Sequence, residues 1–149
     1  MNIAYLLTSM PSKGAVGRRP LNDVIVKDRN NLYGPWPGRN AVQAFQEACD
    51  IEIQGQIPIV FTHGDLVPCN ILVTSGAAPM VAAVIDWAQA GWYPAYWEWC
   101  KAKWVMMGEE DMDGATQEAW RQRYLPLVVD ELPDKTVYYP WFRFALSNF

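Results

Sequence analysis

The sequence lacks the features that mark membrane-spanning, disulfide-linked and secreted proteins. None of its apolar runs approaches the roughly 18 residues that a membrane-spanning helix needs. The three cysteines among 149 residues are widely scattered, which argues against a disulfide framework and for a reducing compartment. The first seven residues lack the basic and apolar regions of a signal peptide. These absences predict a cytoplasmic protein without a membrane partner.

An excess of basic residues is also missing. Lys and Arg number 12 against 16 Asp and Glu, so the net charge is −4, and binding to nucleic acid is not expected because phosphate recognition needs a basic face. Much of the acid lies in the run 109–113, which predicts a solvated loop; a metal or cationic-ligand site is the alternative. The chain is rich only in aromatics, with eight Trp, seven Tyr and five Phe, which suit a core, a small-molecule pocket or an interface.

The length predicts one domain over residues 1–149, and the pattern along the chain predicts a mostly helical α+β fold. Residues 11–40 are rich in Pro, Gly and Asn and are expected to form a long ordered loop. Asn40 and Gln43 resemble a capping box that opens the first helix. We therefore expect an irregular leading segment (1–40), a segment of loops (41–93) and a helical segment (94–149), with a helix over 41–49, strands over 57–61, 71–73 and 80–85, a helix from Pro94 through Met107, a helix over 116–132 that Pro126 kinks or splits, and a last helix over 137–147.

Polar side chains follow the apolar runs that are predicted to be strands. Asp65 and Asn70 lie five residues apart in one loop, and Asp86 follows the next apolar run. If the strands pair, these groups converge on one small volume. Phosphoryl transfer uses such a set: one carboxylate positions the acceptor hydroxyl and takes its proton, while an amide oxygen and a second carboxylate hold Mg²⁺. The alternative is that all three side chains cap the turns of their own loops.

The string His63-Gly64-Asp65-Leu66-x-x-x-Asn70-Ile71-Leu72, followed by Ile85-Asp86-Trp87, resembles the catalytic and metal-binding loops of the aminoglycoside phosphotransferase and choline kinase family. The stretch 90–98 is similar to the fungal branch of that family, and the resemblance covers about residues 8–107. It implies the C-terminal lobe of a protein-kinase-like fold, with a small β element at the two loops.

The resemblance also implies roles for individual residues. Asp65 would be the catalytic base, His63 would orient the catalytic loop, and Asn70 and Asp86 would bind Mg²⁺, with ATP as the phosphoryl donor. Taken by itself, a single histidine beside an apolar strand is more often a hydrogen-bonded structural residue. No nucleotide-binding residues can be assigned. The aromatic residues expected to line a substrate pocket are Trp36, Trp87, Trp92 and Tyr93.

The family's N-terminal lobe has no counterpart here, since Met1 begins inside what resembles the C-terminal lobe and no G-x-G-x-x-G motif occurs. Val67 and Cys69 also make the catalytic loop less polar than in relatives. Three interpretations therefore stay open: an ATP- and Mg²⁺-dependent phosphotransferase that acts on a small-molecule hydroxyl, a repurposed fold that binds or converts an apolar metabolite without a cofactor, such as a cyclase or isomerase of secondary metabolism, and a non-catalytic truncated remnant. A homodimer or a partner chain would cover the surface that the missing lobe exposes.

Overall fold

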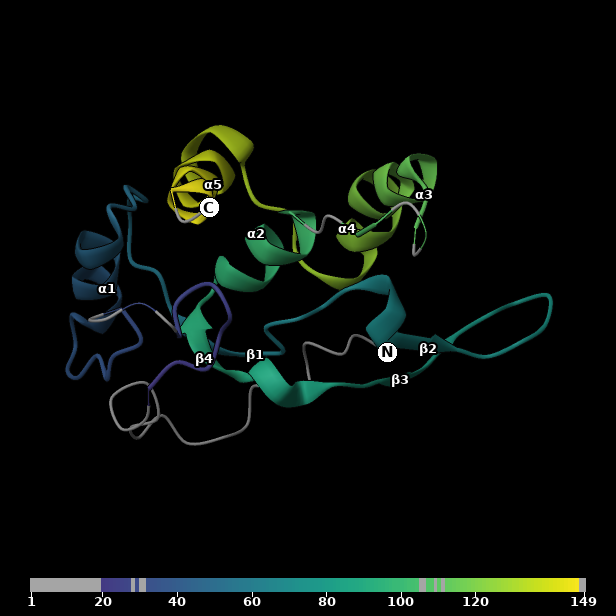
Figure 1. Cartoon of the computed structure of the whole chain (residues 1–149), viewed down its shortest axis with the longest axis horizontal. Coiled ribbons are helices and arrows are strands. Elements are labelled where there is room, and N and C mark those ends of the chain that lie inside the picture. The colour runs from purple at the N-terminus through teal and green to yellow at the C-terminus, as the bar shows by residue number, and fades with distance from the viewer. Residues whose placement is uncertain are drawn as a thin grey trace.

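Two small antiparallel sheets lie beneath a group of helices in the computed structural model, which describes residues 20–27, 29, 32–104, 107–108, 110 and 112–147 (Figure 1). The class is α+β and mostly helical, as predicted. The elements are α1 (Ala41–Cys49), β1 (Ile59–Thr62), β2 (Ile71–Val73), β3 (Val81–Val84), β4 (Gly91–Pro94), α2 (Trp97–Trp104), α3 (Gly114–Ala119), α4 (Leu125–Val128) and α5 (Tyr139–Leu146).

The three predicted strands are present, but they do not form one sheet. β2 pairs with β3, with Ile71 opposite Val84, whereas β1 pairs with β4, with Thr62 opposite Gly91. The prediction that Pro94 opens a helix was wrong, because Pro94 ends β4 opposite Ile59. Proline is tolerated at the end of an edge strand, where its missing N–H breaks no ladder. Helix α2 therefore begins three residues later, at Trp97, and ends before Met107.

The predicted helices over 41–49 and 137–147 correspond to α1 and α5. The structure differs from the predictions in how the helices are capped and in what their prolines do. Asn40 makes no side-chain cap, so the expected capping box does not form. The expected helix over 116–132 begins at Gly114 and ends earlier, at Val128, and it is divided into α3 and α4, with Pro126 in the first turn of α4. A π-helical turn precedes each proline-containing segment, over Trp120–Tyr124 before α4 and over Asp134–Tyr138 before α5. A wider turn relieves the clash between a proline ring and the carbonyl one turn earlier.

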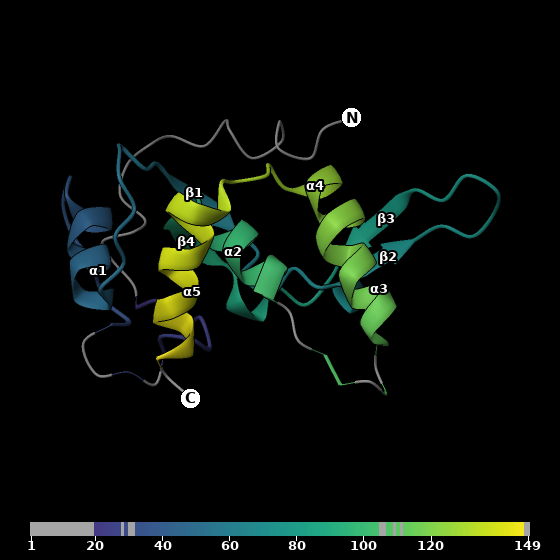
Figure 2. The same ribbon diagram turned by 90° about the horizontal axis from the view of Figure 1, so that it is seen from above.

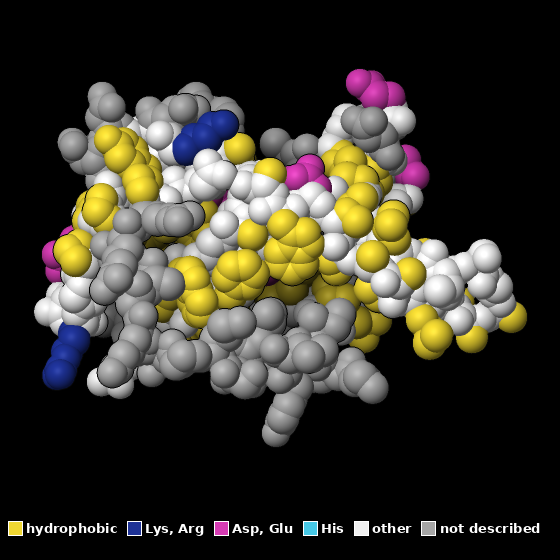
Figure 3. All heavy atoms as spheres, turned by 90° about the horizontal axis from the view of Figure 1, so that it is seen from below, with side chains coloured by type: hydrophobic (Ala, Val, Ile, Leu, Met, Phe, Trp, Pro, Cys, Tyr) yellow, Lys and Arg dark blue, Asp and Glu magenta, His cyan; other side chains and the backbone are white. Residues whose placement is uncertain are grey.

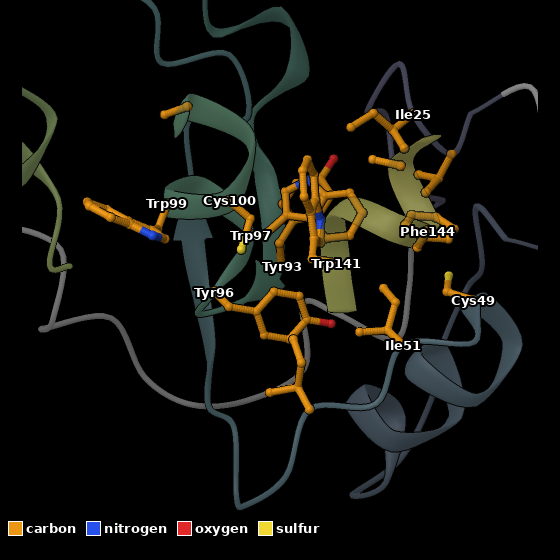
Figure 4. Packing of buried hydrophobic residues seen from close by; sticks show 14 of the residues in the cluster. Ile25, Cys49, Ile51, Tyr93, Tyr96, Trp97, Trp99, Cys100, Trp141 and Phe144 are labelled. Carbon is orange, nitrogen blue, oxygen red and sulfur yellow. The ribbon is translucent and has the colours of Figure 1, made fainter. Parts of the chain in front are cut away.

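Aromatic side chains account for most of the core. Trp97 is fully buried on α2, and its ring lies 5.5 Å from that of Phe45 on α1 and 5.7 Å from that of Trp141 on α5. Tyr93 on β4 stacks on the same indole at 5.6 Å. Figure 4 shows the rings of Tyr93, Trp97 and Trp141 close together between α2 and α5, and Ile25 from the 20–27 segment belongs to the same cluster. Most of the aromatic excess in the sequence thus serves to build the core around α2, which lies between α5 and α4 in Figures 1 and 2.

The β2–β3 hairpin projects away from this core (Figure 2). Residues 71–85 contain no charged residue, and large apolar side chains on the hairpin are exposed, including Val73 and Met80. Figure 3 shows apolar side chains at the end of the hairpin and on the neighbouring face of the body. The rest of the described chain supports this hairpin only at its base.

The long leading loop and the acidic run are described only in part. Residues 20–27 and 32–40 form turns and irregular backbone, as predicted, and the part of the loop over 11–19 lies outside the described residues. Asp113 caps α3 by accepting from the Thr116 amide at 3.0 Å, and Glu110 is exposed. Glu109 and Asp111 lie outside the described residues. Within the described chain, no helix is long and apolar enough to cross a membrane.

The burial of Trp141 predicts a large loss of stability on truncation. Its side chain has 0% exposure, and removal of a buried Trp ring typically costs about 3–5 kcal/mol. We expect Trp141→Ala to lower the free energy of unfolding by about that amount in urea denaturation. Leu127→Ala, at a side chain that is 78% exposed, is the control and should change it by less than about 0.5 kcal/mol. Equal losses in the two variants would contradict the placement of α5.

The cysteines predict a simple thiol count. Burial raises the pKa of Cys49 to about 12 and raises that of Cys100 as well, whereas Cys69 is exposed. Because the thiolate is the reactive form, we expect one fast-reacting thiol with Ellman's reagent at pH 8 in the native protein, and three in guanidinium chloride. The fast phase should disappear in Cys69→Ser. Two or three fast thiols in the native protein would contradict the burial of Cys49 and Cys100.

Candidate active site

The loop after β1 carries the first predicted site residues. Gly64 has φ +79°, and a Cβ at this position would lie 2.5 Å from the Gln89 carbonyl oxygen, so only glycine fits between this loop and the turn over Trp87–Gln89. After Asp65 the chain enters a short 3₁₀ turn over Pro68–Asn70, which leads directly into β2. The catalytic-loop motif therefore occupies the connection between the two sheets.

Asn70 joins this loop to the segment before Asp86. Its side-chain Nδ2 donates to the Asp65 carbonyl oxygen at 2.9 Å, and its own carbonyl oxygen accepts from the Ile85 amide at 2.9 Å. Asn70 is buried, Asp65 is half-buried and Asp86 is exposed. The segments that carry the three strand-end residues thus adjoin one another, although their strands belong to two separate sheets.

His63 holds the same two segments together. Its Nδ1 accepts from the Asp65 amide at 3.2 Å, so the proton lies on Nε2, which donates to the Ile85 carbonyl oxygen at 2.8 Å. The imidazole is buried, and the Trp87 ring lies 4.6 Å from it. With both nitrogens engaged, His63 is placed to orient the loop, and its inclusion among the catalytic residues stays a prediction.

Asp86 has an unusual backbone conformation. It lies in the left-handed region, with φ 58° and ψ 66°, which Asp and Asn adopt more readily than other side chains. Its carboxylate accepts from the Ala88 amide at 3.4 Å and is otherwise exposed. The turn after β3 therefore leaves the Asp86 carboxylate exposed, directly after Ile85, whose backbone bonds to Asn70 and His63.

Glu98 on α2 supports the catalytic loop from the side of the helix. Its carboxylate accepts from the His63 amide at 2.5 Å and from the Gly64 amide at 3.2 Å. Burial raises the pKa of Glu98, and the two backbone amides oppose that effect because they stabilise the carboxylate. In the sequence, Glu98 lies within the family-like stretch 90–98, and residue type alone assigns it no role.

The sequence analysis did not predict the buried ion pair between Lys101 and Asp23. Lys101 on α2 lies 2.8 Å from Asp23, whose side chain has 0% exposure and also accepts from the Trp97 indole at 2.9 Å. Lys101 also donates to the Gly64 carbonyl oxygen and, at 2.7 Å, to Gln89. The available signal was a charged residue one turn after Trp97, on a helix that carries a buried aromatic face.

The four predicted pocket aromatics do not share one pocket. Trp36 and Trp92 line a small apolar cavity between α1 and the β1–β4 sheet, with a volume of about 10 Å³. Tyr93 is fully buried in the core. Trp87 is exposed and lies beside His63. Trp87 directly follows Asp86, and the Tyr93 hydroxyl donates to the Gln89 carbonyl oxygen of the same turn at 3.3 Å from its place in the core.

The donor set fits Mg²⁺ in its chemistry. The Asn70 side-chain nitrogen donates to the Asp65 carbonyl oxygen, and within the described part of the chain the Asn70 side-chain oxygen has the Cys69 thiol, at 4.0 Å, as its donor. Carboxylate and amide oxygens are ligands that Mg²⁺ accepts, usually with several waters. Among the described residues, no three His, Cys, Asp or Glu side chains are grouped to hold a metal ion, so a metal here would depend on the Asp86 carboxylate and the Asn70 amide oxygen.

Comparisons with known proteins give one match. Searches of curated proteins and of solved structures returned no significant match. A family model described as the phosphotransferase enzyme family matches residues 21–136, which include the loops that carry Asp65, Asn70 and Asp86 and also the buried Asp23–Lys101 pair. Because the match covers more than half of the chain, this protein belongs to the phosphotransferase enzyme family.

Proposed function

We propose that the chain takes part in the transfer of the γ-phosphoryl group of ATP to a hydroxyl group of a small molecule. The observation that carries this proposal is the junction of the Asp65–Asn70 loop with the segment before Asp86, through the hydrogen bonds of Asn70 and His63 to Ile85. Membership of the phosphotransferase family supports the reaction class.

In this proposal each polar residue has one task. Asp65 accepts the proton of the acceptor hydroxyl and aligns its oxygen for attack. Asn70 and Asp86 would supply oxygen ligands for Mg²⁺, which would offset the negative charge of the phosphates. His63 and Glu98 hold the backbone of the loop, since they bond to its amides. Positioning is the main contribution of the protein, because phosphoryl transfer needs little covalent chemistry from it.

The apolar cavity beside Trp36 gives little support to the alternative of an apolar metabolite. Its volume of about 10 Å³ is roughly that of one water molecule, whereas pockets for small ligands measure about 300–1,000 Å³. The acceptor in our proposal instead approaches the exposed side of Asp86 and Trp87. We further propose that the described residues correspond to the lobe of a kinase-like fold that carries the catalytic and metal loops.

The proposed role of Asp86 as a metal ligand predicts that stabilisation by Mg²⁺ with ATP depends on its carboxylate. At a hundred times Kd, Mg²⁺ with ATP should add about 2.7 kcal/mol of stability, or roughly 5–10 °C in Tm. We expect Asp86→Asn to lose this shift in differential scanning fluorimetry, because an amide keeps the left-handed backbone but removes the charge. Asp50→Asn is a matched control, since Asp50 is also exposed and has φ 54°. A shift that survives in Asp86→Asn would exclude Asp86 as the metal ligand, and no shift in the wild type would oppose the proposal.

The proposed role of Asp65 as the base predicts how its loss changes the rate of turnover. Loss of a general base typically lowers turnover by about 10²–10⁴-fold. We expect Asp65→Asn to lower Mg²⁺-dependent release of ADP by that factor in a screen of amino alcohols and sugars, while the thermal shift with Mg²⁺ and ATP remains. Unchanged turnover in Asp65→Asn would remove Asp65 from the reaction, and loss of both readouts together would indicate a structural role instead.

A further inference from the structure

Lys101 contacts three segments of the molecule through one ammonium group. It donates to Asp23 in the 20–27 segment, to the Gly64 carbonyl in the catalytic loop, and to the Gln89 side chain in the turn that follows Asp86. The ammonium has three N–H donors, and three acceptors are present. Since Lys101 is only 9% exposed, each of these bonds is shielded from water.

The two acceptors at the site lie next to the residues that matter most for the proposed reaction. Gly64 directly precedes Asp65, and Gln89 is three residues after Asp86. The two segments also touch each other, because the Gln89 carbonyl occupies the space that a side chain at Gly64 would need. Lys101 therefore bonds to both sides of a close backbone contact between the loop that carries Asp65 and the turn that follows Asp86.

Asp23 fixes the position of the ammonium. Its Oδ2 accepts from both Lys101 and the Trp97 indole, and its Oδ1 accepts from the Ile25 amide at 2.8 Å. Gln89 is held in turn by the Val24 amide, which donates to the same side-chain oxygen at 3.0 Å. The charge of Lys101 is thus balanced by a carboxylate of the 20–27 segment, which leaves its other two donors for the two loops.

We propose that Lys101 is a positioning residue for phosphoryl transfer, which sets the spacing between the loop that carries Asp65 and the turn that carries Asp86. This inference rests on the proposed function of the same site. Lys101 touches neither the nucleotide nor the acceptor in this role. It acts through Gly64 and Gln89, and its loss lets the two loops move apart.

The test uses Mn²⁺, an oxygen-preferring probe for the proposed metal site, in the full chain. Binding is followed by electron paramagnetic resonance, and the alkylation rate of exposed Cys69 gives a second, metal-independent report on the catalytic loop. We expect Lys101→Met to weaken Mn²⁺ binding by roughly tenfold or more, the usual effect of losing a residue that orients metal ligands. We also expect Cys69 to be alkylated several times faster in this variant.

Two further variants separate positioning from general stability. Lys103→Met is the matched control, because Lys103 lies on the same helix and has a different ion-pair partner, Asp134, and within the described chain its ammonium bonds to neither loop. It should leave Mn²⁺ affinity and the Cys69 rate unchanged. Gln89→Ala keeps the Lys101–Asp23 pair and removes the Lys101 contact to the turn after Asp86, together with the bond from the Val24 amide, so it should weaken Mn²⁺ binding even if Lys101→Met fails to fold.

The outcomes are distinct. The proposal is overturned if a folded Lys101→Met keeps the wild-type Mn²⁺ affinity and the wild-type Cys69 alkylation rate. It is also overturned if Gln89→Ala keeps the wild-type Mn²⁺ affinity, or if Lys103→Met has the same effect as Lys101→Met. If the wild type binds no Mn²⁺, the proposed function fails at its metal site. The Cys69 rate then decides about Lys101 alone: a faster rate in Lys101→Met supports its hold on the loop, and an unchanged rate overturns it.

Discussion

The buried contact between Lys101 and Asp23 is the interaction on which the arrangement of the site depends. It joins α2 to a segment 78 residues earlier in the chain, and the same ammonium reaches the Gly64 carbonyl and Gln89. Leaving one partner of such a pair buried alone costs about 3–5 kcal/mol, a large part of the roughly 5–15 kcal/mol that stabilise a typical domain. Loss of either charge is therefore expected to destabilise the packing of α2 against the 20–27 segment.

Helix α2 connects the core to the site because some of its side chains pack in the core and others bond to the loop before Asp65. Trp97 and Cys100 are buried among the aromatic rings and thereby fix the position of the helix. Glu98 and Lys101, three residues apart and hence on neighbouring positions of the helix surface, bond to the amides and to the carbonyl of the catalytic loop. Packing of the aromatic core thus determines where the backbone before Asp65 lies.

The β elements show what could be predicted locally. The runs before Asp65 and Asp86 have the apolar, β-branched residues of strands, and β1, β2 and β3 form close to where they were expected. Their pairing was not predictable in the same way, since β1 could have joined β2 and β3 but pairs with β4. Pro94 fits both a first helical turn and the end of an edge strand, and only the partner strand decides between them.

The sequence by itself determined the mostly helical α+β class, the strands and the candidate residues Asp65, Asn70 and Asp86, because these follow from residue type and short spacing along the chain. The tertiary structure alone decided that the loops of these residues adjoin, that the aromatics form a core more than a pocket, and that Glu98 and Lys101 support the catalytic loop. The physical reason is distance along the chain. A lysine whose acceptors are 12, 37 and 78 residues away leaves no periodic pattern, and a charged side chain usually predicts exposure until its partners are seen.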